Sequence, residues 1–329
     1  MKSSDQSFRN ADSDGIETVA VYSMEELAVL SVEGDDALSW LSGQVTNDVR
    51  AIPEGIAIYA IIPNSKGKVL SDLHILQAEE RRFLLTVPAS HLKDIKNHFD
   101  KFIVMEDVEI AVLDEILITA QGPLAATLAR EHPIPASRMF RSERLSSPGI
   151  DWLVPTESAD RALSTLFRAA KDLGGVSLNE TEWRRLLIQE GIPRLDIDFG
   201  PQTLPQEAGL EQRAVSFTKG CYRGQEAIHM LNTRGTTPKR LCQFSFSGDF
   251  DTLEHREICT EEGKSVGFLT SGICTQEPEP TSLALGYLRR TYFEHPQPIF
   301  VGGNAITLRQ EIHLPPSIAL TNGHDTQVD

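Results

Sequence analysis

The pattern of apolar residues in the last quarter of the chain narrows the choice of fold. Between residues 239 and 312 the apolar residues fall in short runs, separated by glycine, proline or acidic turns, and no run has helical spacing. Short strands joined by such turns are typical of a small antiparallel barrel. The runs lie at 241–246, 257–260, 265–271, 282–288 and 305–309. We therefore expect residues 239–312 to form a separate C-terminal β-barrel domain.

Residues 18–238 have a different pattern, in which short strands mix with amphipathic helices. The expected strands lie at 18–22, 28–32, 56–62, 68–77, 82–87 and 108–112. Helical spacing of apolar residues predicts helices over 90–102 and 163–173 and from residue 181. Strand and helix do not alternate as a doubly wound sheet requires, so the pattern predicts an α+β region of two subdomains.

The two ends of the chain lack apolar periodicity. Residues 1–17 are rich in serine, aspartate and asparagine, and residues 313–329 contain two adjacent prolines and a glycine but no regular apolar pattern. Such segments cannot bury enough apolar surface to offset the entropy of ordering them. We expect both to be disordered tails.

The charge balance limits the partners of the chain. Its 329 residues include 31 basic and 47 acidic side chains, which give a net charge of −16. Such a chain repels phosphate backbones, so a nucleic-acid partner is not expected. No apolar run approaches the roughly 20 residues that a membrane span needs, and residues 1–17 lack the pattern of a signal peptide. We expect a cytoplasmic protein with no membrane partner.

The cysteines and histidines predict no metal site. Four cysteines, at positions 221, 242, 259 and 274, lie far apart and form no C-x-x-C pair. This spacing favours neither a disulfide framework nor a zinc ribbon. The nine histidines are scattered, and the common nucleotide-binding, serine-hydrolase and zinc-protease motifs do not occur. Each cysteine must therefore be judged singly.

Cys221 lies in the octapeptide K-G-C-Y-R-G-Q-E, residues 219–226, between Lys219 and Arg223. Residues 213–240 contain six cations and one acid, so a window of charge +5 sits inside an acidic chain. Neighbouring cations and a helix start favour a thiolate, which can act as a nucleophile or a transient ligand. The window predicts a local anion site around Cys221. A turn cysteine that merely packs in the fold is the alternative.

The octapeptide resembles the signature of the YgfZ family, folate-binding proteins tied to the maintenance of iron–sulfur enzymes. Other segments resemble this family or the related glycine-cleavage T-protein, and together they span most of the body of the chain. They are G-I-P-R at 191–194, L-P-Q-E-A-G-L at 204–210, R-G at 234–235, L-S-G-Q-V-T-N-D-V at 41–49, K-G-K-V-L-S-D-L at 66–73, V-G-F-L-T-S-G at 266–272 and L-A-L-G-Y at 283–287.

The resemblance implies a T-protein-like ring of α/β domains around a central channel that holds a reduced folate, with the barrel attached. It places the T-protein's catalytic aspartate at Asp72, while Ser71 replaces the aspartate before it. A carboxylate beside folate nitrogens can hold or accept a proton during one-carbon transfer. The T-protein's pterin-binding glutamate falls on Gln189, which can still hydrogen-bond a pterin edge, and Glu207 is a candidate to share that role.

The remaining cofactor-binding residues follow from the same matches. The octapeptide and its R-G neighbour supply Lys219, Arg223, Gln225, Glu226 and Arg234 as cofactor-binding residues, and the resemblance implies that the glutamate tail of the folate points toward the cations. Asn47 and Asp48 are ligand candidates too, although a T-N-D triplet after a helix is equally typical of a turn or a cap.

The resulting hypothesis is a tetrahydrofolate-binding protein that acts in iron–sulfur cluster assembly or repair, with iron–sulfur enzymes or assembly proteins as partners and Cys221 as the catalytic thiolate. The first alternative is a tetrahydrofolate-dependent aminomethyltransferase centred on Asp72. Ser71 and Gln189, which stand where the T-protein has acidic residues, argue against it. The second is a folate-binding scaffold without chemistry. Whether the chain is an enzyme stays open, a glycine-cleavage activity is not expected, and direct transfer-RNA modification is the least favoured function.

Overall fold

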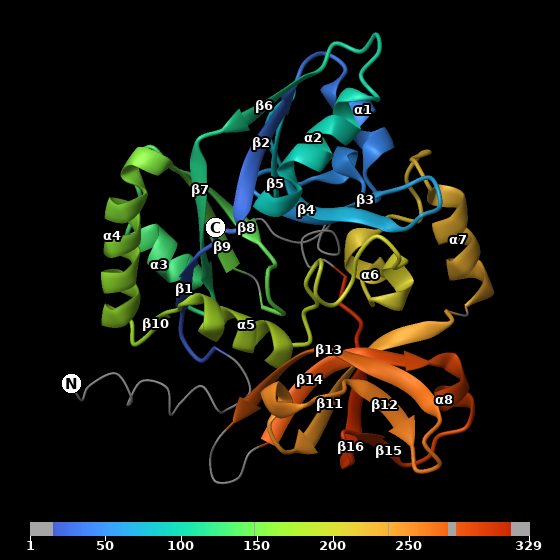
Figure 1. Ribbon diagram of the computed structural model, residues 1–329. Helices are drawn as coiled ribbons and strands as arrows, with labels where there is room; N and C mark the ends of the chain where they lie inside the picture. Colours follow the sequence, from blue (N-terminus) through green and yellow to red (C-terminus); the bar gives the residue numbers. More distant parts are fainter. Residues whose placement is uncertain (1–15, 148, 236, 276–280, 317–329) are drawn as a thin grey trace.

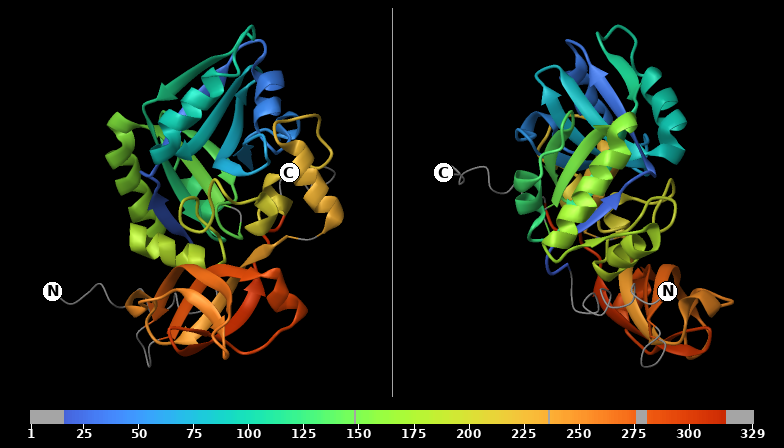
Figure 2. Two further views of the ribbon diagram at one scale, coloured as in Figure 1. Left: turned by 45° about the vertical axis from the view of Figure 1, so that its right-hand side comes forward. Right: turned by 90° about the vertical axis from the view of Figure 1, so that its left-hand side faces the viewer.

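The computed structural model describes residues 16–147, 149–235, 237–275 and 281–316. Within these residues the chain forms two five-stranded sheets and a closed six-stranded barrel. Figure 1 shows the barrel below the two sheets, and the side view in Figure 2 shows the same arrangement. None of the helices in this part of the chain has the length and apolar character that a membrane span requires.

The first sheet has the strand order β3-β4-β5-β2-β6, and each pair of neighbours is antiparallel. Its strands are β2 (Leu27–Glu33), β3 (Ala57–Pro63), β4 (Val69–Glu79), β5 (Arg82–Pro88) and β6 (Glu109–Leu113). Helices α1 (Ala37–Gln44) and α2 (Leu92–Asp100) bury Trp40 and Phe99 in the cluster that also holds Ile58 and Phe83 from the sheet.

Strand β4 shows why the opposite face of this sheet is available for a site. Its residues alternate between buried and half-buried from Val69 to Ile75, as a strand with two distinct faces should. Leu73 joins the core under α1 and α2, whereas Asp72 and His74 point the other way and share a face with Tyr59 of β3. The turn before β4 is closed by Gly67 at φ +73°, and Asn64 Oδ1 accepts from the amides of Lys66 and Lys68.

The second sheet has the strand order β10-β1-β7-β9-β8. Its strands are β1 (Ala20–Ser23), β7 (Glu115–Gln121), β8 (Arg138–Ser142), β9 (Gly149–Pro155) and β10 (Val176–Ser177), and only β1 and β10 run parallel. Helices α3 (Ala125–Glu131) and α4 (Ala159–Asp172) cover one face, where Ile118, Trp152 and Leu166 are buried.

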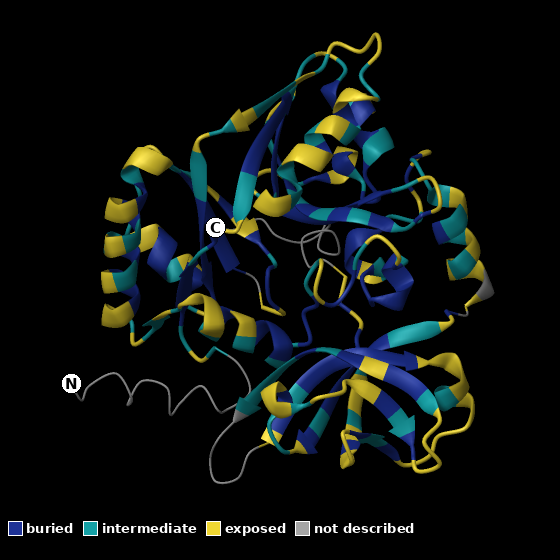
Figure 3. Ribbon diagram, in the orientation of Figure 1, coloured by how far each residue is buried: buried dark blue, intermediate teal, exposed yellow. Residues whose placement is uncertain are grey.

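The uncovered faces of the two sheets contribute to one common core. This core contains Tyr59, Leu84, Leu117 and Leu153. Successive residues of β7 therefore pack on opposite faces: Leu117 lies in the common core and Ile118 in the core under α4. In Figure 3 the exposed residues of α2 and α4 lie outward, while β1, β5 and β9 are mostly buried. Helices α5 (Glu180–Gln189), α6 (Glu211–Ala214) and α7 (Gln225–Arg234) lie beside this core.

The barrel closes in the order β11-β14-β13-β12-β15-β16. Its strands are β11 (Lys239–Ser247), β12 (Glu257–Thr260), β13 (Ser265–Thr275), β14 (Thr281–Arg289), β15 (Ile299–Val301) and β16 (Asn304–Glu311). Phe244, Ile258 and Leu288 fill its interior. The α+β class and the C-terminal antiparallel barrel predicted from the sequence are thus confirmed.

Two elements of the barrel region were not predicted. Strand β15 has three residues and follows two prolines, so it shows no alternation that could identify it. Helix α8 (Arg290–Glu294) is a single turn, which is too short for helical spacing to appear, so the expectation of no helix after residue 239 is wrong at this point.

Short 3₁₀ turns occur at Val49–Ala51, Ala89–His91, Thr156–Ser158, Pro205–Glu207 and Phe250–Thr252.

Polar contacts attach the barrel to the rest of the molecule. Asp198 is 2% exposed, and its Oδ1 accepts hydrogen bonds from Thr270 Oγ1 at 2.6 Å and Ser271 Oγ at 2.7 Å. Its other oxygen accepts from the backbone amide of Arg194 at 2.9 Å. Gln243 of the barrel donates to the backbone oxygen of Gln189 at the end of α5. The barrel therefore fixes the loop after α5, which lines the site described below.

The segment after β16 runs back toward the common core. The amide of Leu314 donates to Gly209 O at 2.9 Å, and its side chain is 4% exposed within the common core. Pro315 O accepts from Arg213 Nε at 3.2 Å. Residues 313–316 of the tail expected at 313–329 are therefore ordered, because one apolar side chain anchors them. Residues 317–329, and all but the last two residues of the expected tail at 1–17, lie outside the described residues.

Candidate functional site

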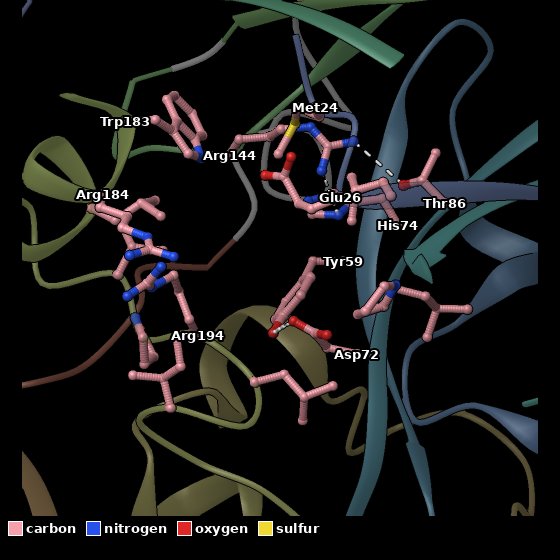
Figure 4. Close-up of a pocket in the computed structure, with 18 of the residues that line it drawn as sticks. Met24, Glu26, Tyr59, Asp72, His74, Thr86, Arg144, Trp183, Arg184 and Arg194 are labelled. Carbon is pink, nitrogen blue, oxygen red and sulfur yellow. Dashed lines mark hydrogen bonds between the residues drawn. The ribbon is translucent and has the colours of Figure 1, made fainter. Parts of the chain in front are cut away.

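A cavity of about 320 Å³ lies between the two sheets and the loop after α5. Strands β3, β4 and β1, helix α5 and residue 314 all contribute to its wall. Figure 4 shows the side chains that surround it. Its polar lining residues include Glu26, Tyr59, Asp72, His74, Thr86, Glu143, Arg144, Glu180, Arg184, Arg194, Asp196 and Arg213.

Asp72 lies in the wall of this cavity and is paired with a tyrosine. Tyr59 Oη donates to Asp72 Oδ2 at 2.9 Å, as the dashed line in Figure 4 marks. Burial raises the pKa of the Asp72 carboxyl above its ordinary value, and the hydrogen bond from Tyr59 partly offsets that rise. Burial also raises the pKa of Tyr59 well above its usual range, so its hydroxyl stays a donor. The pair can hold a proton at the cavity wall.

A buried guanidinium connects the two sheets beside this pair. Arg144 Nε donates to Asp151 Oδ2 of β9 at 2.7 Å, and both side chains are almost fully buried. Its terminal nitrogens reach the first sheet, where one donates to Thr86 Oγ1 and the other to His74 Nδ1, each at 3.3 Å. A buried cation needs such a set of partners because its desolvation is costly. Arg144 therefore fixes one end of the cavity.

The opposite side of the cavity carries aromatic and cationic side chains from α5 and the loop after it. Trp183 stacks on Tyr22 with ring centroids 5.1 Å apart and an angle of 13° between the planes. Figure 4 shows Arg184 and Arg194 together on this side, across from Tyr59 and Asp72. Arg184 pairs with Glu180, whereas Arg194 Nε has no hydrogen-bond partner among the described residues. This side can accept an anionic group.

Helix α5 presents these residues because its N-terminus is firmly capped. Asn179 Oδ1 accepts from the amide of Glu182 at 3.0 Å, and the Glu182 carboxylate accepts from the amide of Asn179 at 2.7 Å. This reciprocal capping box satisfies two amides that would otherwise lack partners. The capped first turn places Trp183 and Arg184 at the cavity.

The octapeptide lies elsewhere, and none of residues 219–226 is among those that line the cavity. Cys221 is exposed to solvent. Lys219, in contrast, is 8% exposed, and its ammonium donates to Ser42 O at 2.8 Å, Val45 O at 2.9 Å and Asn47 O at 2.8 Å. These carbonyls lie at and just after the C-terminus of α1, where helices leave carbonyls unpaired. All three N–H groups of Lys219 are thus engaged within the fold.

The other predicted members of the motif have varied surroundings. Arg223 stacks on Phe102, with its guanidinium carbon 4.4 Å from the ring centroid. Gln225 is half-buried with its Nε2 at 3.5 Å from His229 Nε2, and Glu226 is exposed. Arg234 ends α7, but its side chain lies outside the described part of the chain.

The predicted ligand residues outside the motif also lie away from the cavity lining. Asn47 Nδ2 donates to Tyr59 O at 2.9 Å and to Arg213 O at 3.0 Å, so its buried amide joins two backbones. Asp48 caps a 3₁₀ turn through Arg50 N, and Glu207 accepts from Leu204 N at 3.0 Å. Gln189 is half-buried at the end of α5. In these contacts Asn47, Asp48 and Glu207 support the fold.

The structure brings together site residues that the sequence did not single out. Asp72 is the one predicted site residue among those that line the cavity. Arg213, which belongs to the basic window but was given no role, lines it too. The alternation of β4 offered one signal, since it places His74 on the same face as Asp72. Arg144 lies in a loop, where no periodicity shows which way a side chain points. Arg194 also lies in a loop, but it belongs to the G-I-P-R segment at 191–194, so the family resemblance offered a signal for it.

Comparisons with known proteins agree with this architecture. The family described as the GCVT N-terminal domain matches residues 13–134. The tRNA-modifying protein YgfZ of Yersinia enterocolitica is 28% identical over 236 residues, which cover 68% of this chain and 70% of the relative. The protein of the same name from Photobacterium profundum is 25% identical over 260 residues, which cover 73% and 76%. The predicted resemblance to YgfZ proteins is confirmed.

A solved structure extends the likeness to nearly the whole chain. The glycine cleavage system aminomethyltransferase T from Bartonella henselae superimposes with a TM-score of 0.77 over 93% of this chain and 87% of that chain. The two sequences are 18% identical, so the likeness concerns the fold. The predicted T-protein-like fold is confirmed.

Lys219 allows a direct test of a structural role for the motif. Lys219→Met should lower the free energy of unfolding by about 2–4 kcal/mol, because three backbone carbonyls lose their donor at once. Urea unfolding of the purified variant measures this change. Lys93→Met in α2 is the control, since Lys93 is exposed. A Lys219→Met variant as stable as the control would contradict the assigned role.

Proposed function

We propose that this chain is a tetrahydrofolate-binding protein that acts in the assembly or repair of iron–sulfur clusters. The observation that carries the proposal is the cavity between the two sheets, which has Asp72 in its wall and lies in a T-protein-like fold. The cytoplasmic location expected from the sequence is part of the proposal.

The residues of the cavity suit a reduced folate in size and chemistry. A volume of about 320 Å³ falls at the lower end of the range for ligand pockets. Trp183 and Tyr22 offer apolar ring surface to a pterin or benzoyl group. Arg184 and Arg194 offer positive charge to the glutamate carboxylates. These cations take the place of Lys219, Arg223 and Arg234, for which the sequence predicted that role.

Asp72 supplies proton chemistry at the site. When bound, tetrahydrofolate would supply nitrogen atoms that carry one-carbon groups. Because burial raises the pKa of Asp72 and Tyr59 donates to one of its oxygens, the carboxyl can hold a proton on its other oxygen. Asp72 is also what favours the second candidate function, a tetrahydrofolate-dependent aminomethyltransferase. Ser71 is fully buried on the opposite face of β4, so Asp72 would act there without a neighbouring acid.

Cys221 is the proposed thiolate for the iron–sulfur part of the function. Its exposure leaves it open to a partner protein, and the iron or sulfur species would be its substrate. The chemistry at Cys221 would then take place outside the cavity. A folate-binding scaffold without chemistry is the competing proposal, and it assigns Cys221 no role.

The name of the curated relatives, tRNA-modifying protein, suggests a further candidate. We propose that any link between this chain and transfer RNA passes through iron–sulfur enzymes that it maintains. The net charge of −16 supports this view, because whole-surface contact with RNA needs a positive field.

Calorimetric titration with tetrahydrofolate tests the cavity. We expect the unaltered protein to bind, and Arg194→Gln to weaken binding about tenfold because a charge-assisted contact is lost. Arg223→Gln is the matched control, since Arg223 does not line the cavity, and it should bind as the unaltered protein does. Absence of binding, or a loss confined to Arg223→Gln, would refute the assignment.

Complementation tests the thiolate. In a strain that lacks the gene, Cys221→Ser should fail to restore the activity of an iron–sulfur enzyme, while tetrahydrofolate binding stays intact because Cys221 lies off the cavity. Cys259→Ser is the control for loss of a thiol, as Cys259 is partly buried in the barrel. Full restoration by Cys221→Ser would favour the scaffold proposal instead.

A further inference from the structure

His74 is a cavity residue whose tautomer the structure determines. Its Nδ1 lies 3.3 Å from a terminal nitrogen of Arg144. A guanidinium is a donor only, so Nδ1 must accept that hydrogen bond and cannot carry a proton. The single proton of a neutral imidazole then sits on Nε2. His74 is therefore a neutral ring with an Nε2–H donor.

The surroundings of His74 oppose a second proton on the ring. Burial imposes a desolvation cost on a charged ring, and Arg144 and Arg213 add positive charge nearby. Together they lower the pKa of His74 well below its ordinary value. The Asp151 carboxylate does not reverse this, because its Oδ2 accepts from Arg144. The ring thus stays neutral at physiological pH.

The Nε2–H group lacks an acceptor within the described part of the chain. Nε2 is buried and has no hydrogen-bond partner there, although His74 lines the cavity. Its ring lies against Tyr59, with centroids 5.1 Å apart, and it shares a face of β4 with Asp72. A buried donor without an acceptor is costly, and proteins keep such groups where a ligand completes the bond.

We propose that His74 is a ligand-binding residue that donates its Nε2–H to the C4 carbonyl oxygen of a pterin ring and thereby selects 4-oxo over 4-amino pteridines. This assignment rests on the proposed folate function and adds a specificity residue to it. A carbonyl oxygen is the natural partner of a neutral N–H donor. A 4-amino ring places a second donor opposite Nε2–H, and a site built for one hydrogen bond rejects a ligand that cannot complete it.

The test compares two ligands on three proteins by calorimetry. The ligands are tetrahydrofolate and its 4-amino analogue, tetrahydroaminopterin. The proteins are the unaltered chain, His74→Gln, whose amide N–H can occupy the Nε2 position, and His74→Asn, whose shorter amide reaches only the Nδ1 position. We expect the unaltered chain to prefer tetrahydrofolate at least tenfold, His74→Gln to keep most of this preference and His74→Asn to lose it.

The ratio of the two affinities separates recognition from a structural role. A role in packing alone would weaken both ligands equally and leave the ratio unchanged. Loss of the preference in His74→Asn, with retention in His74→Gln, supports the assignment. An unaltered chain without a preference, or a His74→Asn variant that keeps it, overturns the assignment but leaves the folate function standing. An unaltered chain that binds neither ligand overturns both.

Nitrogen-15 NMR of the unaltered protein tests the same claim without a substitution. His74 should show the pattern of a neutral ring protonated on Nε2, with no titration between pH 5.5 and 8, and tetrahydrofolate should shift its Nε2 resonance. A ring that titrates near its ordinary pKa, or carries its proton on Nδ1, would overturn the assignment even if neither variant folds.

Discussion

The two sheets are tied together by one buried cation. Arg144 pairs with Asp151 in β9 of the second sheet and donates to Thr86 and His74 in the first, so a single guanidinium spans the interface that forms the cavity. Removing one partner of such a buried pair typically costs about 3–5 kcal/mol, because the other charge stays buried alone. The same contact orients His74. Arg144 therefore contributes both to the contact between the sheets and to the chemistry of the cavity wall.

The octapeptide and the cavity are separate in space yet connected by hydrogen bonds. Lys219 donates to the backbone oxygen of Asn47, and the side chain of Asn47 donates to the backbone oxygens of Tyr59 and Arg213. Tyr59 in turn donates to Asp72. The motif thus helps to position two residues of the cavity, while Cys221 stays exposed. One segment serves the folded core through its lysine and presents a thiol to solvent.

Local patterns in the sequence predicted the elements better than the site. The strand expected at 68–77 is β4 with bounds close to those predicted, because burial of one face imposes alternation. Asp72 was identified through a motif and does line the cavity. Arg144 was missed because its direction depends on His74 and Thr86 of the first sheet, which lie 70 and 58 residues away in the sequence. Arg194 belongs to the G-I-P-R segment at 191–194 but was given no role, because the barrel fixes its loop through Asp198. The basic window around Cys221 suggested an anion site, but the Lys219 ammonium is buried and donates to backbone carbonyls instead.

The central claim is that the cavity between the sheets, rather than the octapeptide, holds the folate. Hydrogen–deuterium exchange with and without tetrahydrofolate tests this most directly, because it reports which backbone segments the ligand protects. The account predicts slower exchange in β4 and in α5 with the loop after it, and unchanged exchange over residues 219–226. Protection confined to residues 219–226, with β4 and α5 unaffected, would contradict it.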